Sequence, residues 1–542
     1  MEIKEVVLPS INKFASDYMK NLFTVKDFFH YDLKEVNVFG QRYEDLMQRS
    51  FNRKDLSLTI ENYMKPFGLS TEVKSNLERL KQKDAVVVIG GQQAGLLTGP
   101  LYTIHKVISI IKVAKEQEML LGKPVIPVFW IAGEDHDLEE VNHVYVEQNQ
   151  AFKKVKYPSS TISKAMITDV QLDKLTLEKW LKEIFSSFEE TAYTKDLYNT
   201  LLGYSLKSPS FTHFFSCIIN ELFQKYGLLL IDSADDSFRT MQSTFFETLI
   251  QQHESINQAV KQQQEYIAQQ GYKPIIAMDE KNANLFYYEH EERVLLEYDA
   301  EHDLFRGKNH SLQLTKEQLL EIARNEPEKL SNNVVTRPLM QEFLFPVQAF
   351  ISGPGEIAYW SELKKAFEQV GMHMCPIIPR MNITLLEKKV QKDLADVDMD
   401  VYEALVQGAE KAKERFLNRI EDEQVSGLFE KLESQFKRNH FLLSQAAKTL
   451  DKGLEPIFEK NSELIQEQLQ FLRNKIQQSV NSKHSHELAK YNRITNALRP
   501  NGGPQERTTN IYYFLNQYGP EFMNELMDLN FESNSFHKVV VL

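Results

Sequence analysis

A short apolar run that ends in a glycine-rich loop is the strongest constraint in this chain. The run Ala85–Ile89 is followed by Gly90-Gly-Gln-Gln-Ala-Gly95, and the apolar spacing of Leu101–Lys115 indicates a helix. A short valine-rich run is typical of a strand buried on both faces of a parallel sheet. Backbone N–H groups where such a loop opens a helix attract phosphate or carboxylate. The sequence therefore predicts the strand–loop–helix unit of a ligand-binding α/β domain.

The glycine-rich loop matches neither of two familiar phosphate-binding signatures. It lacks the G-x-G-x-x-G spacing of dinucleotide sites, and no Gly-Lys-Ser/Thr follows it as in a P-loop. We predict that Thr98 caps the following helix, with Pro100 in its first turn. His105 then falls on the second turn, where it is either a substrate-binding group or a structural histidine.

Further apolar runs lead into polar loops. Pro124–Ala132 precedes an acidic loop, Leu228–Asp232 is another core strand, Phe345–Ser352 precedes Gly353-Pro-Gly355, and Cys375–Pro379 is the last expected strand. The carboxyl ends of parallel strands meet at one edge of an open sheet, and ligands bind there. The sequence therefore predicts a pocket walled by these loops.

The loop after the second strand is dense in ionisable groups. Glu134, Asp135, His136 and Asp137 are consecutive, and they suit binding of a substrate ammonium or acid–base chemistry. One imidazole among carboxylates lacks a clear tetrahedral ligand set, so we assign no metal. The alternative interpretation is a charged loop that caps the next helix.

The later strand ends add a second group of candidates. Ser352, Gly353 and Glu356 follow one strand, and Arg380 and Asn382 follow the next. An arginine at such an edge suits a carboxylate or a phosphate. Glu356 opens a helix, where the helix dipole alone favours an acidic residue, so a capping role is the alternative.

The organisation of the chain changes after the last core strand. Gly and Pro are scarce over 384–490, and apolar stripes there predict two long antiparallel helices, an arm resembling a coiled coil; a helical bundle packed on the main body is the alternative. An extended arm buries its stripe against a partner, so we expect a homodimer. A chain of 542 residues is too long for one hydrophobic core, so we divide it into seven segments. The segments are the N-terminal helices with the first part of the core (1–139), a first insertion (140–210), a core segment (211–270), a second insertion (271–330), a core segment (331–383), the arm (384–490) and a C-terminal segment (491–542).

Composition excludes several classes of protein. The net charge of −13 argues against a general nucleic-acid binder, and two cysteines, Cys217 and Cys375, cannot form a disulfide framework. The start of the chain lacks the apolar core of a signal peptide, and no run is long enough to span a membrane. We therefore expect a cytoplasmic protein that binds neither nucleic acid nor membrane.

A turn-rich basic loop near the end is a candidate for a second phosphate or nucleotide site. Glycines flanked by arginine and asparagine let backbone amides approach a phosphate. A plain surface loop is the alternative. The candidate nucleotide-binding residues are Tyr491, Asn492, Arg493, Arg499, Asn501 and Arg507.

Three motifs also carry a family resemblance. Gly90–Lys106, Trp130–Asp137 and Ile351–Glu356 closely resemble the cysteine ligase family of bacillithiol biosynthesis (BshC), and the likeness covers the full chain. The resemblance implies that L-cysteine is joined to the amino group of glucosaminyl-malate as an amide. It also implies an α/β fold: a Rossmann-like core with two inserted connecting-peptide segments, as in class I aminoacyl-tRNA synthetases, plus an α-helical antiparallel coiled-coil domain that dimerises.

The chain departs from the synthetase pattern in the motifs that bind ATP. Thr103–Lys106 and Arg380–Thr384 occupy comparable places but match neither His-Ile-Gly-His nor Lys-Met-Ser-Lys-Ser. Because amide formation from a free carboxylate is uphill, we expect an ATP-linked ligase, with ATP or ADP as its nucleotide. The missing motifs indicate a pocket that holds substrate rather than one that forms an adenylate. The alternatives are a synthetase-like nucleotidyltransferase acting on another acid and a non-enzymatic scaffold.

The expected roles follow the strand ends. Substrate is oriented by the first loop and helix and by the loop within the third motif, and a carboxylate is held at the last strand end. The acidic loop holds the cysteine ammonium and supplies the base. The residues that orient substrate are Gly91, Gln92, Gln93, Thr98, Tyr102, His105, Ser352, Gly353 and Glu356. Arg380 and Asn382 hold the carboxylate. Asp135 or Asp137 holds the ammonium, and His136 or Glu134 is the base.

Overall fold

The computed structural model describes residues 1–9, 12–20, 23–159, 164–308, 312–420, 423–531, 534 and 536–542. The chain forms two compact units, one made of 1–385 with 505–541 and the other of 386–504 with Leu542. Each unit is considered by itself. No helix in the described ranges is long and apolar enough to cross a membrane.

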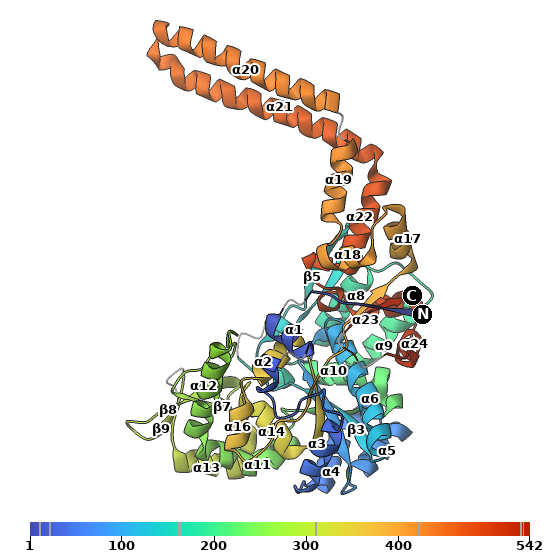
Figure 1. Cartoon of the computed structure of the whole chain (residues 1–542), viewed down its shortest axis with the longest axis vertical. Coiled ribbons are helices and arrows are strands. Elements are labelled where there is room, and N and C mark those ends of the chain that lie inside the picture. The colour runs from blue at the N-terminus through green and yellow to red at the C-terminus, as the bar shows by residue number, and fades with distance from the viewer. Residues whose placement is uncertain are drawn as a thin grey trace. The chain divides into compact units, whose positions relative to one another are not determined.

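A five-stranded parallel sheet forms the centre of the first unit (Figure 1). Its strands stand in the order β13, β12, β2, β3, β6, so the order reverses between β2 and β12, and ligands bind at such a switch point. The expected strands are all present, and β2 continues through both glycines to Gln92. The Rossmann-like arrangement is thereby confirmed; the strands are β2 (Val86–Gln92), β3 (Val125–Ile131), β6 (Leu229–Asp232), β12 (Val347–Ser352) and β13 (Ile377–Pro379).

The helix after the glycine-rich loop is confirmed, but its predicted cap is wrong. Helix α6 spans Tyr102–Leu121, with Leu101 at its N-cap and no side-chain cap. The backbone of Thr98 is left-handed (φ 72°), and its buried hydroxyl has no hydrogen-bond partner. The C-terminal segment holds this turn instead: Asn510 Nδ2 donates to the carbonyls of Leu97 and Gly99 at 2.8 and 2.7 Å.

Both predicted insertions contain their own secondary structure. The first has a hairpin, β4 (His143–Gln148) and β5 (Ala151–Lys156), as expected. The second forms a five-stranded antiparallel sheet in the order β10, β9, β8, β7, β11. The remaining elements of the two insertions are α7 (Leu138–Val141), α8 (Lys174–Phe185), α9 (Thr194–Lys207), β7 (Asn282–Glu289), β8 (Glu292–Asp299), β9 (Leu304–Gly307), β10 (Gln313–Thr315), α13 (Lys316–Asn325) and β11 (Leu330–Asn332).

Helices cover the central sheet, and the two chain ends pair beside it. Contacts join α3 to β12, α4 to β6 and α5 to β3. Strand β1 (Glu2–Val6) pairs with β15 (His537–Val541), which neighbours β14 (Ile383–Leu386). The other helices of this unit are α1 (Lys13–Met19), α2 (Phe23–Lys26), α3 (Val38–Met47), α4 (Arg53–Met64), α5 (Thr71–Leu80), α10 (Phe211–Phe223), α11 (Asp236–Gln251), α12 (His253–Gln269), α14 (Thr336–Leu344), α15 (Pro354–Trp360), α16 (Lys364–Gln369), α23 (Ile511–Tyr518) and α24 (Phe522–Asp528).

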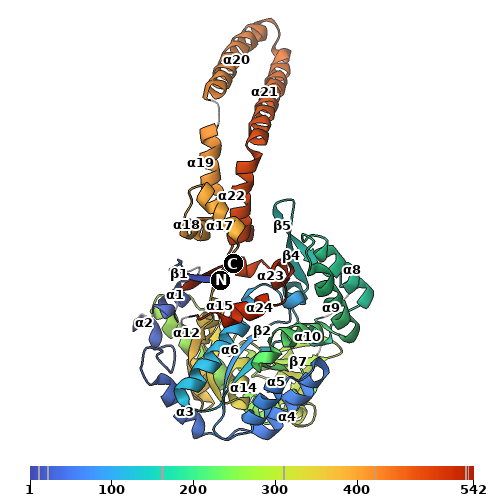
Figure 2. The ribbon, with the colours of Figure 1, turned by 90° about the vertical axis from the view of Figure 1, so that its right-hand side faces the viewer.

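The second unit is helical and contains the predicted antiparallel pair. Helices α20 (Glu423–Leu450) and α21 (Glu455–Lys483) lie side by side in Figures 1 and 2, joined by the turn Lys452–Leu454. The remaining helices of this unit are α17 (Lys388–Asp396), α18 (Val401–Gln407), α19 (Glu410–Ile420) and α22 (Ser485–Leu498).

A buried ion pair joins the N-terminal helices to the sheet. Arg42 of α3 donates to both carboxylate oxygens of Glu342 in α14, at 2.6 and 2.7 Å, and its Nε donates to Val347 O at 2.9 Å. The two side chains are 1% and 2% exposed. A buried charge without a partner is costly, so this pair constrains how α3 packs against β12.

Replacing Glu342 by leucine leaves Arg42 buried without its counter-charge. We expect the free energy of unfolding, measured by urea titration with circular dichroism, to fall by about 3–5 kcal/mol. The double variant Arg42→Met/Glu342→Leu should recover part of this loss, because an apolar pair of similar volume often replaces a buried ion pair without cost, whereas Arg49, which also pairs with Glu342, still loses its partner. A loss below about 1 kcal/mol in the single variant would contradict the role assigned to the pair.

Candidate functional site

A cavity of about 700 Å³ lies at the carboxyl ends of the central strands. Its walls come from the glycine-rich loop, the acidic loop, the β4–β5 hairpin, the starts of α6, α14 and α15, and the C-terminal segment. The lining residues are Gly91, Gln92, Gln93, Pro100, Tyr102, Lys106, Trp130, Ala132, Asp135, Glu139, Glu140, His143, Tyr145, Lys154, Arg337, Pro338, Gln341, Phe350, Gly353, Pro354, Gly355, Glu356, Tyr359, Trp360, Arg380 and Arg507.

The paired glycines at the end of β2 allow the floor of this cavity to close. A Cβ on Gly90 would stand 3.1 Å from Ile351 O of β12, and one on Gly91 would stand 3.0 Å from Trp130 O of β3. Both contacts are with neighbouring backbone, which cannot give way without displacing a strand. The glycines therefore serve close strand packing as well as an open loop.

Arginines neutralise the acidic loop. Arg337 of α14 donates through Nε to Glu134 at 2.6 Å and through a terminal nitrogen to Asp135, while Asn332 N donates to the other Glu134 oxygen at 3.2 Å. Burial raises the pKa of Asp135, but the charges of Arg337 and Arg293 outweigh it and the net shift is downward. Asp135 is therefore ionised, and Glu134 has both oxygens engaged.

His136 lies beside the same arginine cluster. Its Nδ1 accepts a hydrogen bond of 3.2 Å from Arg293, which can only donate. Burial and then the Arg293 charge lower the pKa of His136, so the imidazole is neutral at pH 7 with its hydrogen on Nε2. Asp137 is the N-cap residue of α7 but makes no side-chain capping bond.

A second wall of the cavity carries a buried lysine. Lys106 of α6 donates from Nζ to Gly91 O at 2.6 Å and to Glu356 Oε2 at 2.5 Å. Glu356 Oε2 also accepts from Gly353 N at 2.7 Å, in a capping box at the start of α15. The capping interpretation of Glu356 is therefore correct, and the same carboxylate also lines the cavity.

Glu506 of the C-terminal segment engages the remaining charged groups of this wall. It accepts from both terminal nitrogens of Arg380, at 2.9 and 2.8 Å, and lies 3.3 Å from His105 Nδ1. Burial alone would raise the pKa of Glu506, but Arg380 and His105 hold it well below the usual carboxyl range. Burial lowers the pKa of His105, which is fully inaccessible to solvent.

The structure brings eight of the predicted catalytic and substrate-binding residues into the cavity wall. The eight are Gly91, Gln92, Gln93, Tyr102, Asp135, Gly353, Glu356 and Arg380. Seven others lie outside the lining, and their roles stay predictions: Thr98, His105, Glu134, His136, Asp137, Ser352 and Asn382.

Several lining residues were not predicted for this site. Lys106 is the last residue of the motif Gly90–Lys106, and its position directly after His105 was the signal that could have identified it. Arg337 opens a helix with no distinctive pattern around it. His143, Tyr145 and Lys154 come from the hairpin, whose approach to the cavity depends on tertiary packing.

The predicted second nucleotide site is divided between the two units. Arg507 belongs to the first unit and lines the main cavity, whereas the other five residues belong to the second unit. In the second unit, Arg493 is paired with Asp393 at 2.7 and 2.9 Å, and Arg499 donates to Leu405 O at 2.8 Å.

Three other members of that predicted site also belong to the second unit. Tyr491 is buried, Asn492 accepts a 2.7 Å hydrogen bond from Lys413, and Asn501 has a left-handed backbone (φ 53°). Neither these contacts nor those of the two arginines tests nucleotide binding, which stays a prediction for this unit.

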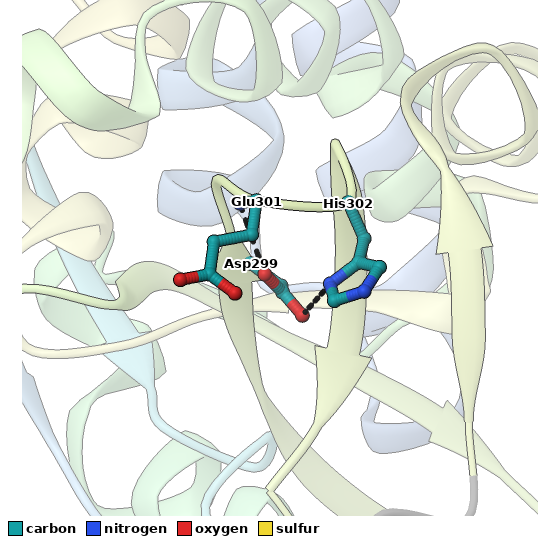
Figure 3. Close-up of side chains that lie close together, drawn as sticks. All are labelled: Asp299, Glu301 and His302. Atoms are coloured by element: carbon teal, nitrogen blue, oxygen red, sulfur yellow. Dashed lines mark hydrogen bonds and ion pairs between the residues drawn. The ribbon is translucent and has the colours of Figure 1, made fainter.

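One cluster of potential metal ligands lies outside the cavity. Asp299, Glu301 and His302 converge at the exposed turn after β8 (Figure 3). His302 Nδ1 and Arg306 each lie 2.9 Å from Asp299 Oδ2, so the charge of this carboxylate is already compensated. Exposed acidic turns of this kind are ordinary surface features, and the cluster establishes no metal centre.

Replacing Glu506 by glutamine leaves Arg380 buried without its counter-charge. We expect the free energy of unfolding at pH 7 to fall by about 3–5 kcal/mol, whereas exposed Glu525→Gln in the same segment should change it by under about 0.5 kcal/mol. Because the pKa of Glu506 is lowered on folding, its stabilisation is complete above the unfolded pKa and is lost as the pH falls below it. Denaturant titrations should therefore show the gap between wild type and Glu506→Gln narrowing only below about pH 4.3; a gap independent of pH would contradict this assignment.

Comparison with known proteins identifies the family. The model described as Bacillithiol biosynthesis BshC, N-terminal Rossmann-like domain, matches residues 1–381, and that of the BshC C-terminal coiled-coil domain matches 383–542. A protein of Geobacillus thermodenitrificans is 42% identical over 542 residues, and one of Bacillus licheniformis is 41% identical over 545 residues, each covering 100% of both chains. Both are named "Putative cysteine ligase BshC". The chain therefore belongs, over its whole length, to the BshC family of bacillithiol biosynthesis.

Proposed function

We propose that this chain is the ligase that joins L-cysteine to the amino group of glucosaminyl-malate, forming the amide of bacillithiol. Membership of the BshC family supports the pathway and the class of enzyme. The observation that carries the proposal is one cavity at the switch point of the sheet, lined by both carboxylates and cations. Such a cavity suits an amino acid together with an amine that also carries carboxylates.

Asp135 is the proposed acceptor for the cysteine ammonium. It lines the cavity, it is ionised, and its Oδ2 accepts a 3.5 Å hydrogen bond from Gln93 Nε2. Glu140 lines the same wall and accepts from Gln93. Because Glu134 and His136 are engaged outside the lining, we assign acceptance of the amine proton to Glu140 rather than to either of them.

Arg507 is the proposed anchor for the malate carboxylates. Arg380 has both terminal nitrogens committed to Glu506, which leaves it little capacity for a second carboxylate. No hydrogen bond or ion pair joins Arg507 to another residue in the described ranges, and its side chain is exposed at the cavity. A free guanidinium binds a carboxylate through two parallel hydrogen bonds.

Formation of an amide from a free carboxylate in water is uphill, so the cysteine carboxyl must be activated. We propose ATP as the activating co-substrate and the cytoplasm as the place of the reaction. The departures from the synthetase motifs around Lys106 and Arg380 favour an acyl phosphate over an adenylate. The corresponding nucleotide product is ADP rather than AMP.

Reconstitution of the purified chain tests this function. With L-cysteine, glucosaminyl-malate and ATP, mass spectrometry should detect the thiol amide and ADP, and omission of ATP should abolish the product. Arg507→Gln should raise KM for glucosaminyl-malate about tenfold, the loss of one charged hydrogen-bonded pair, with KM for cysteine unchanged. Asp135→Asn should raise KM for cysteine and leave KM for glucosaminyl-malate unchanged.

The control for Arg507 is Arg438→Gln, an exposed arginine of α20, which should change neither KM. If no amide forms with any nucleoside triphosphate, the proposed function is refuted. Equal KM changes for both substrates in Arg507→Gln would refute the malate assignment alone.

We also propose that the arm mediates a homodimer. Helices α20 and α21 pair with each other, yet each keeps large apolar side chains exposed. Covering such surface from water is the main driving force for association. The exposed residues are Leu428, Leu432, Phe441, Leu442, Leu443, Leu450, Ile457, Leu464, Phe471 and Leu472.

Light scattering after size-exclusion chromatography tests the dimer. The intact chain should have twice its own mass of 63.1 kDa, and the double substitution Leu443→Glu/Leu472→Glu should give the monomer because it places charges on the apolar surface. Substituting Glu430→Gln and Glu459→Gln, two exposed carboxylates that lie away from these leucines on the same helices, is the control and should leave the dimer intact. An intact chain that is already monomeric would refute the proposal.

A further inference from the structure

Lys106 is a buried charged group at the cavity that the proposed function leaves without a role. Its side chain is 2% exposed, yet it lines the cavity. Burial lowers its pKa, and Glu356 opposes that shift. A buried lysine in a cleft is costly to maintain and is a frequent mark of a functional group.

One of the three N–H donors of Lys106 has no acceptor among the described residues. A lysine ammonium has three N–H donors and no acceptor. Gly91 O and Glu356 Oε2 accept two of them, at 2.6 and 2.5 Å. No third acceptor is found among the residues that the structure describes, and a buried donor without an acceptor costs free energy unless a ligand or water completes it.

The charges around Lys106 favour an anion as that acceptor. Arg380 acts electrostatically on Lys106, and Arg507, Glu140, Arg380 and Glu356 all act on the adjacent Tyr102. Glu356 pairs with Lys106 and Glu506 pairs with Arg380, so Arg507 is the cation of this group that has no paired carboxylate among the described residues. The pair Lys106–Glu356 alone is neutral; it is the surplus from Arg507 that makes the wall attractive to a carboxylate.

We infer that Lys106 binds the carboxylate of the amino-acid substrate through its third N–H, opposite the ammonium site at Asp135. This inference rests on the proposed function for the identity of that amino acid, L-cysteine. An α-amino acid has its ammonium and carboxylate on one carbon, and Asp135 and Lys106 both line the same cavity.

The same contact gives Lys106 a part in the reaction. ATP converts one carboxylate oxygen into an acyl phosphate and releases ADP, and Lys106 keeps its hydrogen bond to the other oxygen. When the amine attacks, the C–N bond forms and the carbonyl electron pair moves to the oxygen held by Lys106. The pair returns as the C–O bond to phosphate breaks, and the amine proton passes to Glu140. A preorganised cation at the developing oxyanion lowers this barrier.

A purely structural lysine would behave differently. It would hold the Gly91 carbonyl and Glu356 in place, and its loss would weaken the binding of every ligand in the cavity to a similar degree. A carboxylate anchor affects only ligands that carry a carboxylate. L-Cysteine and cysteamine form the matched probe pair, because cysteamine is cysteine without its carboxylate.

Calorimetric titration of the full-length protein with both probes separates the two roles. We expect wild type to bind L-cysteine at least about tenfold more tightly than cysteamine, and Lys106→Met to reduce that ratio to near one with cysteamine affinity retained. Lys106→Arg should keep most of the ratio. Lys106→Gln, which retains amide donors for Gly91 and Glu356 but no charge, should lose it and serves if the methionine variant does not fold.

Lys112→Met is the matched control on the same helix. Lys112 Nζ also donates to two backbone carbonyls, Met527 O and Leu529 O, both at 2.7 Å, but it lies outside the cavity lining. This variant should lower the melting temperature and leave the ratio unchanged.

The outcomes distinguish this inference from the proposed function. An unchanged ratio in folded Lys106→Met and Lys106→Gln, or equal loss of both probes, would overturn the role of Lys106, even if the chain makes the amide. A ratio that depends on Lys106 in a chain that forms no amide would support the carboxylate anchor and refute the ligase. Wild type that binds neither probe would overturn both.

Discussion

The buried carboxylate of Glu506 is the contact on which the candidate site depends. It joins Arg380, at the end of β13, to His105 of α6, and it comes from a segment more than a hundred residues further along the chain. Asn510, four residues later, holds the turn that leads into α6. Because a buried arginine needs its counter-charge, the C-terminal segment must dock before the cavity exists in this form.

Compensation of buried charge also determines which groups remain for a ligand. Arg337 is occupied by Glu134 and Asp135, and Arg380 by Glu506, so the most conspicuous charged residues are largely used in holding one another. The exposed guanidinium of Arg507 and one N–H of Lys106 are among the groups that remain for a ligand. A site of this kind is preorganised: its charges are fixed by protein partners before substrate arrives, so binding does not have to reorient them.

The sequence predicts the framework of the fold well because the framework depends on local patterns. Valine-rich runs such as Val86–Ile89 are strands in any context that buries both faces, and the apolar period of α6 identifies a helix without knowledge of its neighbours. The cap at Thr98 was predicted from the same local grammar and is wrong, because Asn510 stabilises a left-handed turn there instead. The candidate site was predicted only in part for the same reason: a strand end can be located from sequence, but the orientation of each side chain after it depends on its partners.

The sequence by itself determined the order of strands and helices, the position of the glycine-rich loop, the helical arm and the family to which the chain belongs. Each of these depends on residue type and spacing over short stretches. Only the tertiary structure decided that Lys106 and Arg507 line the cavity, that His105 and Glu134 do not, and that Glu506 links the two chain segments around it. Those outcomes depend on which buried charges meet, and the meeting of residues hundreds of positions apart is set by packing of the whole unit rather than by any local pattern.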